Sequence, residues 1–330
     1  MATSQIIRTK IAPPRKSARF LTRPRVNRAL AEALNYRLTV LQAGAGYGKS
    51  SALTELVKEN CDVIWYHVTR EDSDPLVFLL HLCHATQSAI KDIKGLPTAL
   101  LEAWDGSRGP LPSEEILHQY LNALSEIPSK PALLVMDDVH LAVNTAEFTH
   151  LLDRVIGLAP PGFQIALSTR PILKLPNLSR WRSGGEVLDL DKSLLAFTDD
   201  EISDLFVDCY NYEITAEEAQ RLSTVTEGWA IALQLIWQSL RTGAAASIED
   251  ALDRQVSSVS SLFEVLANEV LTQQPRDVQD FLWASAALRV MTSQACDAVL
   301  GRTDSASMLN YLRRQELFVV DLGDEGLRYQ

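Results

Sequence analysis

Short apolar runs alternate with longer amphipathic stretches between Tyr36 and about residue 195. The runs are rich in β-branched and aliphatic residues and nearly free of charge, as expected for strands that a parallel sheet buries on both faces. Helical periodicity fills the intervals between them. The alternation predicts an α/β domain with a parallel sheet. Its strands are expected at Leu38–Gln42, Val63–Val68, Leu133–Asp137, Gln164–Ser168 and Glu186–Leu190, and its helices at Lys49–Glu59, Leu76–Ile90, Ser113–Ser125 and Thr145–Leu158.

After about residue 195 the strand pattern stops and helical periodicity continues. Thr198 and Thr215 stand where helix N-caps are expected, and Gly228-Trp229 precedes the apolar helix Ala230–Leu240. Four further helices are expected at Leu262–Leu271, Pro275–Ala284, Ser293–Leu300 and Ser305–Glu316. A strand at Leu317–Leu322 and a Gly-Asp-Glu-Gly turn follow, so this region is predicted to be a winged-helix unit.

These patterns divide the chain into four parts: a basic leader (1–28) that packs on the ligand site, an α/β domain (29–195), a small helical domain (196–257) and a winged-helix domain (258–330). The last residues fall inside what would be the second strand of the final hairpin. A strand that stops there leaves backbone groups of its partner unpaired. We therefore expect the chain to be the amino-terminal piece of a longer protein.

Composition and charge narrow the class of protein. The chain of 330 residues is 46% hydrophobic and 22% charged, with a formal net charge of −11. These values favour a globular protein of two or three domains and argue against one that coats nucleic acid with its whole surface. The four cysteines lie far apart without a CxxC pair, and no apolar run could span a bilayer. We expect a cytoplasmic protein without a membrane partner.

The first 28 residues contain eight basic residues and no acidic one. Such a segment is compatible with an organelle-targeting peptide or with an arm that binds nucleic acid. It is also compatible with a partly ordered leader whose arginines lie near a bound phosphate ligand. The leader runs directly into a folded motif, which favours the last interpretation.

The segment Ala43-Gly-Ala-Gly-Tyr-Gly-Lys49-Ser50 lies between a predicted strand and a predicted helix. Glycines in a loop at this place allow backbone amides to surround a phosphate, and the helix adds its positive N-terminal end. Ala43 stands where the strict phosphate-loop pattern has glycine. The predicted nucleotide-binding residues are Gly44, Ala45, Gly46, Tyr47, Gly48, Lys49, Ser50 and Ser51. Lys49 is expected to reach the β- and γ-phosphates, and Ser50 to ligate Mg²⁺.

A second motif, Leu133-Leu-Val-Met-Asp137-Asp138, ends a predicted strand in two carboxylates. Asp137 suits the carboxylate that holds Mg²⁺ in a nucleotide site, and Asp138 suits the group that polarises an attacking water. The next strand is followed by Arg170, which is predicted to sense the terminal phosphate or that water. His140 is expected to be a packing or hydrogen-bonding residue. Two motifs in this order predict binding of ATP or ADP with Mg²⁺.

The chain resembles the amino-terminal part of MalT-type regulators, which are large LuxR-type ATP-dependent transcriptional activators within the STAND class of P-loop ATPases. The resemblance covers nearly the whole chain. It rests on Arg23-Pro-Arg25, the Ala-Gly-Tyr-Gly-Lys-Ser loop, Trp65-Tyr66, Asp74-Pro75, Asp137-Asp138-Val-His140, Leu167-Ser-Thr-Arg170, Leu195-Ala-Phe197-Thr, Glu227-Gly-Trp229-Ala and the stretch from Phe281-Leu-Trp-Ala-Ser to Leu317-Phe-Val-Val. The combination is more specific than the phosphate loop alone.

The resemblance implies an ATPase domain, a helical domain and a winged-helix domain that close over ADP or ATP. It implies catalytic roles for Asp137, Asp138 and Arg170, a metal site at Ser50 and Asp137, and an approach of Arg25, Gly228 and Trp229 to the adenosine. It further implies slow hydrolysis that gates self-association in the ATP state. Inducer and DNA would bind only to carboxy-terminal domains that this sequence does not include.

Two alternatives remain open at the level of the sequence. The same ATPase switch occurs in signalling and defence proteins that do not regulate transcription, and only sequence beyond residue 330 would distinguish them. The winged helix and the basic leader could also bind nucleic acid directly. However, residues 261–330 contain six basic and ten acidic residues, so duplex DNA would be repelled by much of that surface.

Overall fold

The computed structural model describes residues 6–16, 19–56, 61–91, 93–107, 109–126, 131–254, 274–288, 290–315, 319–321 and 327–329. The expected helix Leu262–Leu271 and the Gly323–Gly326 turn lie outside these residues. The chain divides into two compact units. The first comprises residues 1–43 and 48–195, and the second comprises residues 44–47 and 196–330.

The first unit is built on a parallel sheet of five strands in the order β2-β3-β4-β1-β5. The strands are β1 (Leu38–Gln42), β2 (Asp62–His67), β3 (Ala132–Asp137), β4 (Phe163–Thr169) and β5 (Val187–Leu190). All five were expected from the sequence, with bounds that differ by one residue at most. Every residue of β3 is buried, as are four of the five in β1, which explains their near-continuous apolar sequence.

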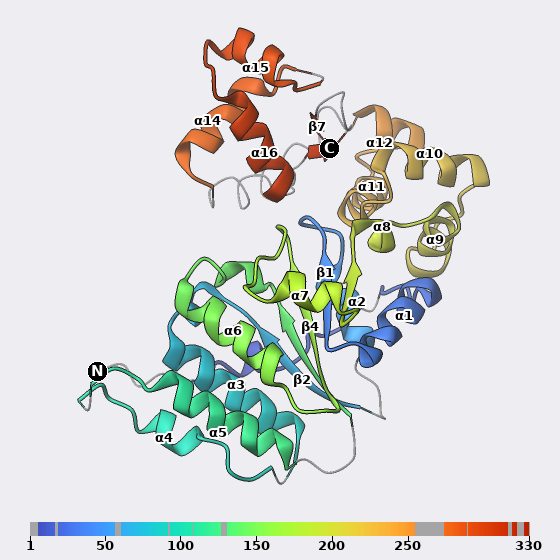
Figure 1. Cartoon of the computed structure of the whole chain (residues 1–330). Coiled ribbons are helices and arrows are strands. Elements are labelled where there is room, and N and C mark those ends of the chain that lie inside the picture. The colour runs from blue at the N-terminus through green and yellow to red at the C-terminus, as the bar shows by residue number, and fades with distance from the viewer. Residues whose placement is uncertain are drawn as a thin grey trace. The chain divides into compact units, whose positions relative to one another are not determined.

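Helices cover both faces of this sheet (Figure 1). The chain passes from β1 to the far edge at β2 and then returns step by step, so right-handed crossovers place the first connecting helix opposite the others. The first crossover contains α2 (Lys49–Leu53) and the 3-10 turn η3 (Thr54–Leu56), which is shorter than the expected helix Lys49–Glu59. The later crossovers contain η4 (Arg70–Ser73), α3 (Pro75–Ala89), α4 (Thr98–Glu102), α5 (Ser113–Ser125), η5 (Val139–Leu141), α6 (Ala146–Leu158) and α7 (Leu178–Ser183).

The N-terminal segment is part of this unit. It contains η1 (Arg8–Ile11), α1 (Pro24–Ala31) and η2 (Glu32–Asn35), and α1 runs through the expected boundary between residues 28 and 29. Lys10 is buried against η4, where its Nζ lies 2.7 Å from both carboxylate oxygens of Asp72. Asp72 also accepts hydrogen bonds from the Tyr66 hydroxyl (2.6 Å) and the Thr69 amide (2.6 Å). This segment of the leader is therefore fixed by a buried ion pair.

The second unit begins, after α8 (Lys192–Leu195) of the first, with helices only. They are α9 (Asp199–Asp204), the π-helical turn η6 (Leu205–Cys209), α10 (Ala216–Thr226), α11 (Ala230–Thr242) and α12 (Ile248–Arg254). Thr198 and Thr215 cap α9 and α10 in reciprocal pairs with Glu201 and Glu218, as the sequence predicted. Gly243 ends α11 with a left-handed backbone.

The described part of residues 274–329 contains α14 (Arg276–Ser285), α15 (Ser293–Leu300), α16 (Ser305–Gln315) and the antiparallel hairpin of β6 (Val319–Asp321) and β7 (Leu327–Tyr329). Phe281, Leu282, Cys296, Leu312 and Leu327 form its small core. Helices followed by a two-stranded wing are the arrangement that the sequence predicted for this region. Among the described residues, no helix is both long and apolar enough to cross a membrane.

Candidate functional site

The loop after β1 has the backbone geometry of a phosphate-binding loop. Gly46 and Gly48 have φ values of 76° and 80°, in the left-handed region that favours glycine. Gly48 is the N-cap residue of α2, so the loop leads directly into the N-terminal end of a helix, where the helix dipole favours an anion. The Lys49 side chain is buried and its Nζ donates to the Ala43 carbonyl at 2.8 Å, across the base of the loop.

Asp137 ends β3 and is 2% exposed. Its Oδ1 accepts a hydrogen bond from the Ser168 hydroxyl on β4, and His67 and Ser50 also lie at this carboxylate. Burial acts to raise the pKa of Asp137, but the polar contacts with His67, Ser168 and Ser50 outweigh it and the pKa is lowered. Asp137 is therefore an ionised carboxylate beside the Ser50 hydroxyl, as a Mg²⁺ site requires.

Asp138 has a left-handed backbone (φ 58°, ψ 39°), which is uncommon for a residue with a side chain. Its amide donates to the Ser168 hydroxyl at 2.8 Å, so one serine fixes both consecutive aspartates. Burial and the neighbouring charge of Asp137 raise the pKa of Asp138. Strained backbone of this kind costs about 1–3 kcal/mol and is concentrated at functional sites.

Two further polar side chains at this edge of the sheet have buried atoms without hydrogen-bond partners. Both ring nitrogens of His140 are buried and unpartnered, and the closer one lies 3.7 Å from Asp138 Oδ1. Burial, together with the charges of Arg170 and Lys49, lowers the pKa of His140 to about 3, so the imidazole is neutral. The Nε atom of Arg170 is also buried without a partner. His140 was expected to be a packing or hydrogen-bonding residue, and its ring nitrogens make no hydrogen bond here.

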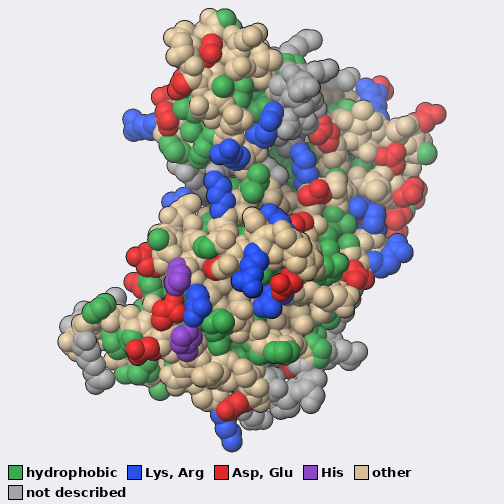
Figure 2. All heavy atoms as spheres, in the orientation of Figure 1, with side chains coloured by type: hydrophobic (Ala, Val, Ile, Leu, Met, Phe, Trp, Pro, Cys, Tyr) green, Lys and Arg blue, Asp and Glu red, His purple; other side chains and the backbone are tan. Residues whose placement is uncertain are grey.

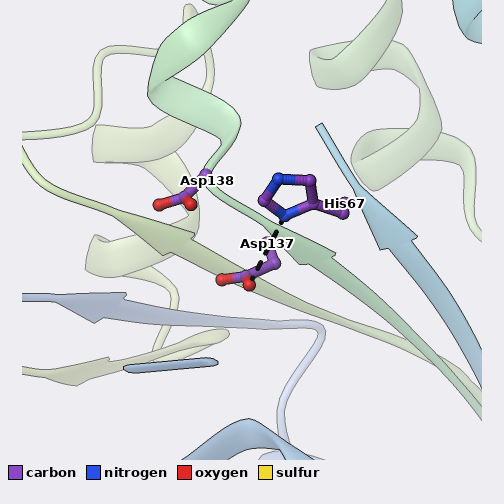
Figure 3. Close-up of side chains that lie close together, drawn as sticks. All are labelled: His67, Asp137 and Asp138. Atoms are coloured by element: carbon purple, nitrogen blue, oxygen red, sulfur yellow. Dashed lines mark ion pairs between the residues drawn. The ribbon is translucent and has the colours of Figure 1, made fainter. Parts of the chain in front are cut away.

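His67 was not singled out from the sequence. It ends β2, and its Nδ1 lies 3.7 Å from Asp137 Oδ2 (Figure 3). The interaction with Asp137 raises the pKa of His67. The rule that flagged Asp137 and Arg170, that ligand-facing groups follow the carboxyl ends of parallel strands, applies to His67 as well. Ser168 was quoted only as part of a motif, yet it links the two aspartates.

The four loop residues 44–47 belong to the second unit, with residues that precede and begin α11. Trp229 Nε1 donates to the Ala45 carbonyl at 2.9 Å, and the Ile231 amide donates to the Gly46 carbonyl at 3.2 Å. A Cβ atom on Gly46 would lie 2.7 Å from the Ile231 side chain. Tyr47 is buried, with its ring centre 6.3 Å from that of Trp229. The carbonyl side of the loop is thus held by Trp229 and Ile231.

Gly228 fixes the turn before Trp229. Its φ is 68°, and an added Cβ would lie 2.4 Å from the Phe197 carbonyl oxygen, so no other residue fits here without movement of the backbone. Of the remaining predicted residues, Ser51 is exposed on α2, and Arg25 is half-buried in α1. Arg23, in the same motif, donates to the Leu195 carbonyl at 2.7 Å.

Comparisons with known proteins show which proteins the chain resembles. The family described as the MalT winged helix domain matches residues 267–330. The chain is similar to the HTH-type transcriptional regulators MalT of Cronobacter sakazakii (28% identical over 322 residues) and Yersinia enterocolitica (29% over 324 residues). Each match covers 97% of this chain and 35% of the regulator, so the chain spans about a third of the length of these relatives.

Among solved structures, the Walker-type ATPase of Pyrococcus abyssi has the same fold. It aligns with a TM-score of 0.59 at 18% identity and covers 94% of this chain and 93% of its own. The chain therefore has a P-loop ATPase fold followed by helical and winged-helix parts, and its resemblance to MalT-type regulators is confirmed.

Proposed function

We propose that the chain is the ATP- and ADP-binding switch of a transcriptional regulator similar to MalT. The observation that carries the proposal is that Lys49, after β1, and Asp137 and Asp138, at the end of β3, lie at the carboxyl-terminal edge of one parallel sheet in a P-loop ATPase fold. The similarity to MalT over 97% of the chain supports the regulatory role. Inducer binding and promoter binding would belong to parts of the relatives that this chain does not span.

The residues present fit a divalent cation beside the nucleotide. Ser50 and Asp137 lie together, and the lowered pKa of Asp137 keeps the carboxylate ionised. These two residues would hold the cation, which when bound would neutralise negative charge on the phosphates. Lys49 would give up its hydrogen bond to the Ala43 carbonyl and donate to the phosphates instead. The amides of the loop would surround the phosphates.

Asp138 is suited to orient and polarise the water that attacks the terminal phosphate. It follows the cation carboxylate directly, and its strained backbone is fixed by Ser168. Arg170, whose buried Nε is unpartnered, would respond to the terminal phosphate. Hydrolysis would be slow, since a switch keeps each nucleotide state long enough for it to be sensed. In the ATP state the regulator would self-associate.

Trp229 would transmit the nucleotide state to the helical domain. Residues 44–47 are held through the Ala45 and Gly46 carbonyls, so a loop that reorients on phosphate binding changes the contacts at the start of α11. Trp229→Phe removes the indole donor and keeps the aromatic ring. We expect this variant to release ADP faster than the wild type, and an unchanged release rate would contradict the coupling.

The first experiment is to identify the nucleotide that the purified protein carries. The protein is denatured and the released compounds are separated by chromatography; we expect one equivalent of ADP or ATP. Lys49→Ala should contain none and should bind added nucleotide at least about 100-fold more weakly, because the phosphate charge loses its nearest cation. Lys174→Ala, which removes an exposed lysine from the same unit, is the matched control.

Two results would overturn the proposal. One is wild-type protein that carries no nucleotide and binds neither added ATP nor ADP. The other is equal affinity in the wild type and Lys49→Ala, with circular dichroism showing that both are folded.

A further inference from the structure

We propose that the cation site takes a third ligand from His67 and therefore binds transition metals that accept imidazole readily, such as Co²⁺ or Zn²⁺, without nucleotide. This inference deepens the proposed function, because it concerns the same site and rests on it. It assigns to His67 a role that neither the phosphate loop nor the two aspartates require. His67 is the residue that extends this site along the sheet to β2.

The geometry comes from the ligands His67 and Asp137, which end two adjacent strands, with the Asp138 carboxylate beside them (Figure 3). One ligand atom from each of His67, Asp137 and Asp138 can be chosen so that all three lie within 4.8 Å of one another. Among the described residues, this is the one group of three or more histidine, cysteine, aspartate or glutamate side chains with that property. His67 pairs with Asp137 in the register of β2 and β3, so the sheet itself sets their separation.

The distance between His67 Nδ1 and Asp137 Oδ2 is 3.7 Å, which is too long for a hydrogen bond. A metal ion bound to both atoms at about 2.1 Å would bring them to a separation of roughly 3–4 Å, so it fits between them without movement of the backbone. The His67 side chain is 41% exposed, which leaves a path for a hydrated ion. The aspartates supply negative charge beside it.

The ligand set determines which metals bind. Mg²⁺ takes oxygen ligands and rarely an imidazole, whereas Mn²⁺, Co²⁺ and Zn²⁺ accept imidazole together with carboxylates. Ser50 and Asp137 alone would form an ordinary Mg²⁺ site that depends on the phosphates for further ligands. With His67, the protein offers three ligands of its own, so a transition metal should bind before any nucleotide does.

The test is a titration of the protein, freed of nucleotide and metal, with Co²⁺ and followed by the visible absorption of the bound ion. We expect wild-type protein to bind one equivalent and His67→Ala to bind at least about tenfold more weakly. His67→Gln, a polar replacement of similar length, should show the same loss. His84→Ala removes a partly exposed histidine on α3 that pairs with Glu102, and its Co²⁺ affinity should equal that of the wild type.

Equal Co²⁺ affinity in the wild type and both His67 variants would overturn the inference, as would no binding to wild-type protein. The affinity of a Mg²⁺–nucleotide complex should change less than twofold in His67→Ala, and a loss as large as that for Co²⁺ would also contradict the assignment. Lys49→Ala separates the two proposals. It should lose nucleotide and keep Co²⁺, so failure of nucleotide binding in the wild type would leave the metal titration interpretable.

Discussion

The α/β unit contains two buried carboxylate centres that differ in how well their polar groups are satisfied. At the first, Asp72 is fully buried and accepts hydrogen bonds from Lys10, Tyr66 and Thr69. At the second, Asp137 and Asp138 are adjacent like charges, one with a strained backbone. Beside them, His140 and Arg170 have buried nitrogens without partners. Asp72 lies in η4, which follows β2, and Asp137 ends β3, so the two centres follow adjacent strands of one sheet.

The difference separates a structural centre from a functional one. A buried charge is tolerated where its partners are complete, and such a network fixes one conformation. Buried polar groups without partners cost stability, so a fold retains them where a ligand supplies the missing contacts. The Lys10–Asp72 centre anchors the N-terminal segment, and the Asp137–Asp138 centre is the one at which we propose that phosphate and a cation bind. On the face shown in Figure 2, the basic and acidic side chains of the α/β unit are interspersed and do not form patches of one sign.

The largest effect is expected from Lys10→Met. The variant leaves the fully buried Asp72 without its cation, and removal of one partner from such a pair lowers the free energy of unfolding by about 3–5 kcal/mol. Urea denaturation followed by circular dichroism measures the change. Lys174→Met, which removes an exposed charge from the same unit, should stay within about 0.5 kcal/mol of the wild type. Equal stability of the two variants would mean that the Lys10 pair is not structural.

Asp138→Asn is expected to slow hydrolysis without lowering the free energy of unfolding. Loss of a group that activates water slows the reaction by about 10²–10⁴-fold, which single-turnover phosphate release would detect. The free energy of unfolding should not fall, because burial and the neighbouring charge of Asp137 both raise the pKa of Asp138 and so disfavour the charge that the variant removes. Asp208→Asn, at an exposed position, serves as the control. Unchanged turnover in Asp138→Asn would mean that another group activates the attacking water.

A pair of smaller substitutions compares the polar groups directly. Tyr66→Phe removes a donor from Asp72 and should cost about 1–3 kcal/mol. His140→Leu removes two unpartnered nitrogens, so its cost should be below about 1 kcal/mol in the ligand-free protein. Both free energies come from denaturation with nucleotide removed. A cost for His140→Leu as large as that for Tyr66→Phe would show that the imidazole is satisfied in solution.

The smallest effect is a pH dependence at the structural centre. His81 accepts a hydrogen bond from the Ile7 amide (3.4 Å) and its Nδ1 contacts the Val77 carbonyl (2.8 Å), an arrangement of the neutral ring. Burial lowers the pKa of His81, despite the Val77 carbonyl that favours the charged form. As pH falls, the unfolded chain takes up the proton on His81 before the folded chain does. The contribution of neutral His81 to the free energy of unfolding is therefore present above the ordinary pKa of about 6.5 and is lost as pH falls below it.

Urea midpoints measured between about pH 7.5 and about pH 5.5 test this dependence, since that interval brackets the ordinary histidine pKa. His81→Gln should show a flatter profile than the wild type. A variant profile as steep as that of the wild type would place the pH dependence on other groups.

The sequence was sufficient for the sheet and for the part of the site that follows a local pattern. Strands buried on both faces have a continuous apolar sequence, so all five were located, and the phosphate loop and Asp137-Asp138 were recognised from spacing. Among the described residues, five short helices were not expected, because each spans only about two turns or less and has too few residues for a periodic pattern: α1, α4, α7, α8 and α12.

The residues that were missed depend on pairing between strands. Nothing next to His67 in the sequence indicates that it faces Asp137; the register of β2 and β3 brings them together. Ser168 is similar, since its hydroxyl reaches both aspartates only because β4 lies beside β3. The Lys10–Asp72 pair joins residues 62 positions apart and could not be inferred from the basic composition of the leader.

The strand that carries His67 lies at the edge of the sheet, with β3 as its one neighbour in the strand order. The His67 side chain is more exposed than those of Asp137 and Asp138, so exchange of residue 67 disturbs little packing. Exchange of Asp137, within the sheet, would disturb the polar contacts of β4 as well. Position 67 is thus where evolution or an engineer could change the metal preference of this ATPase fold at small cost to its stability.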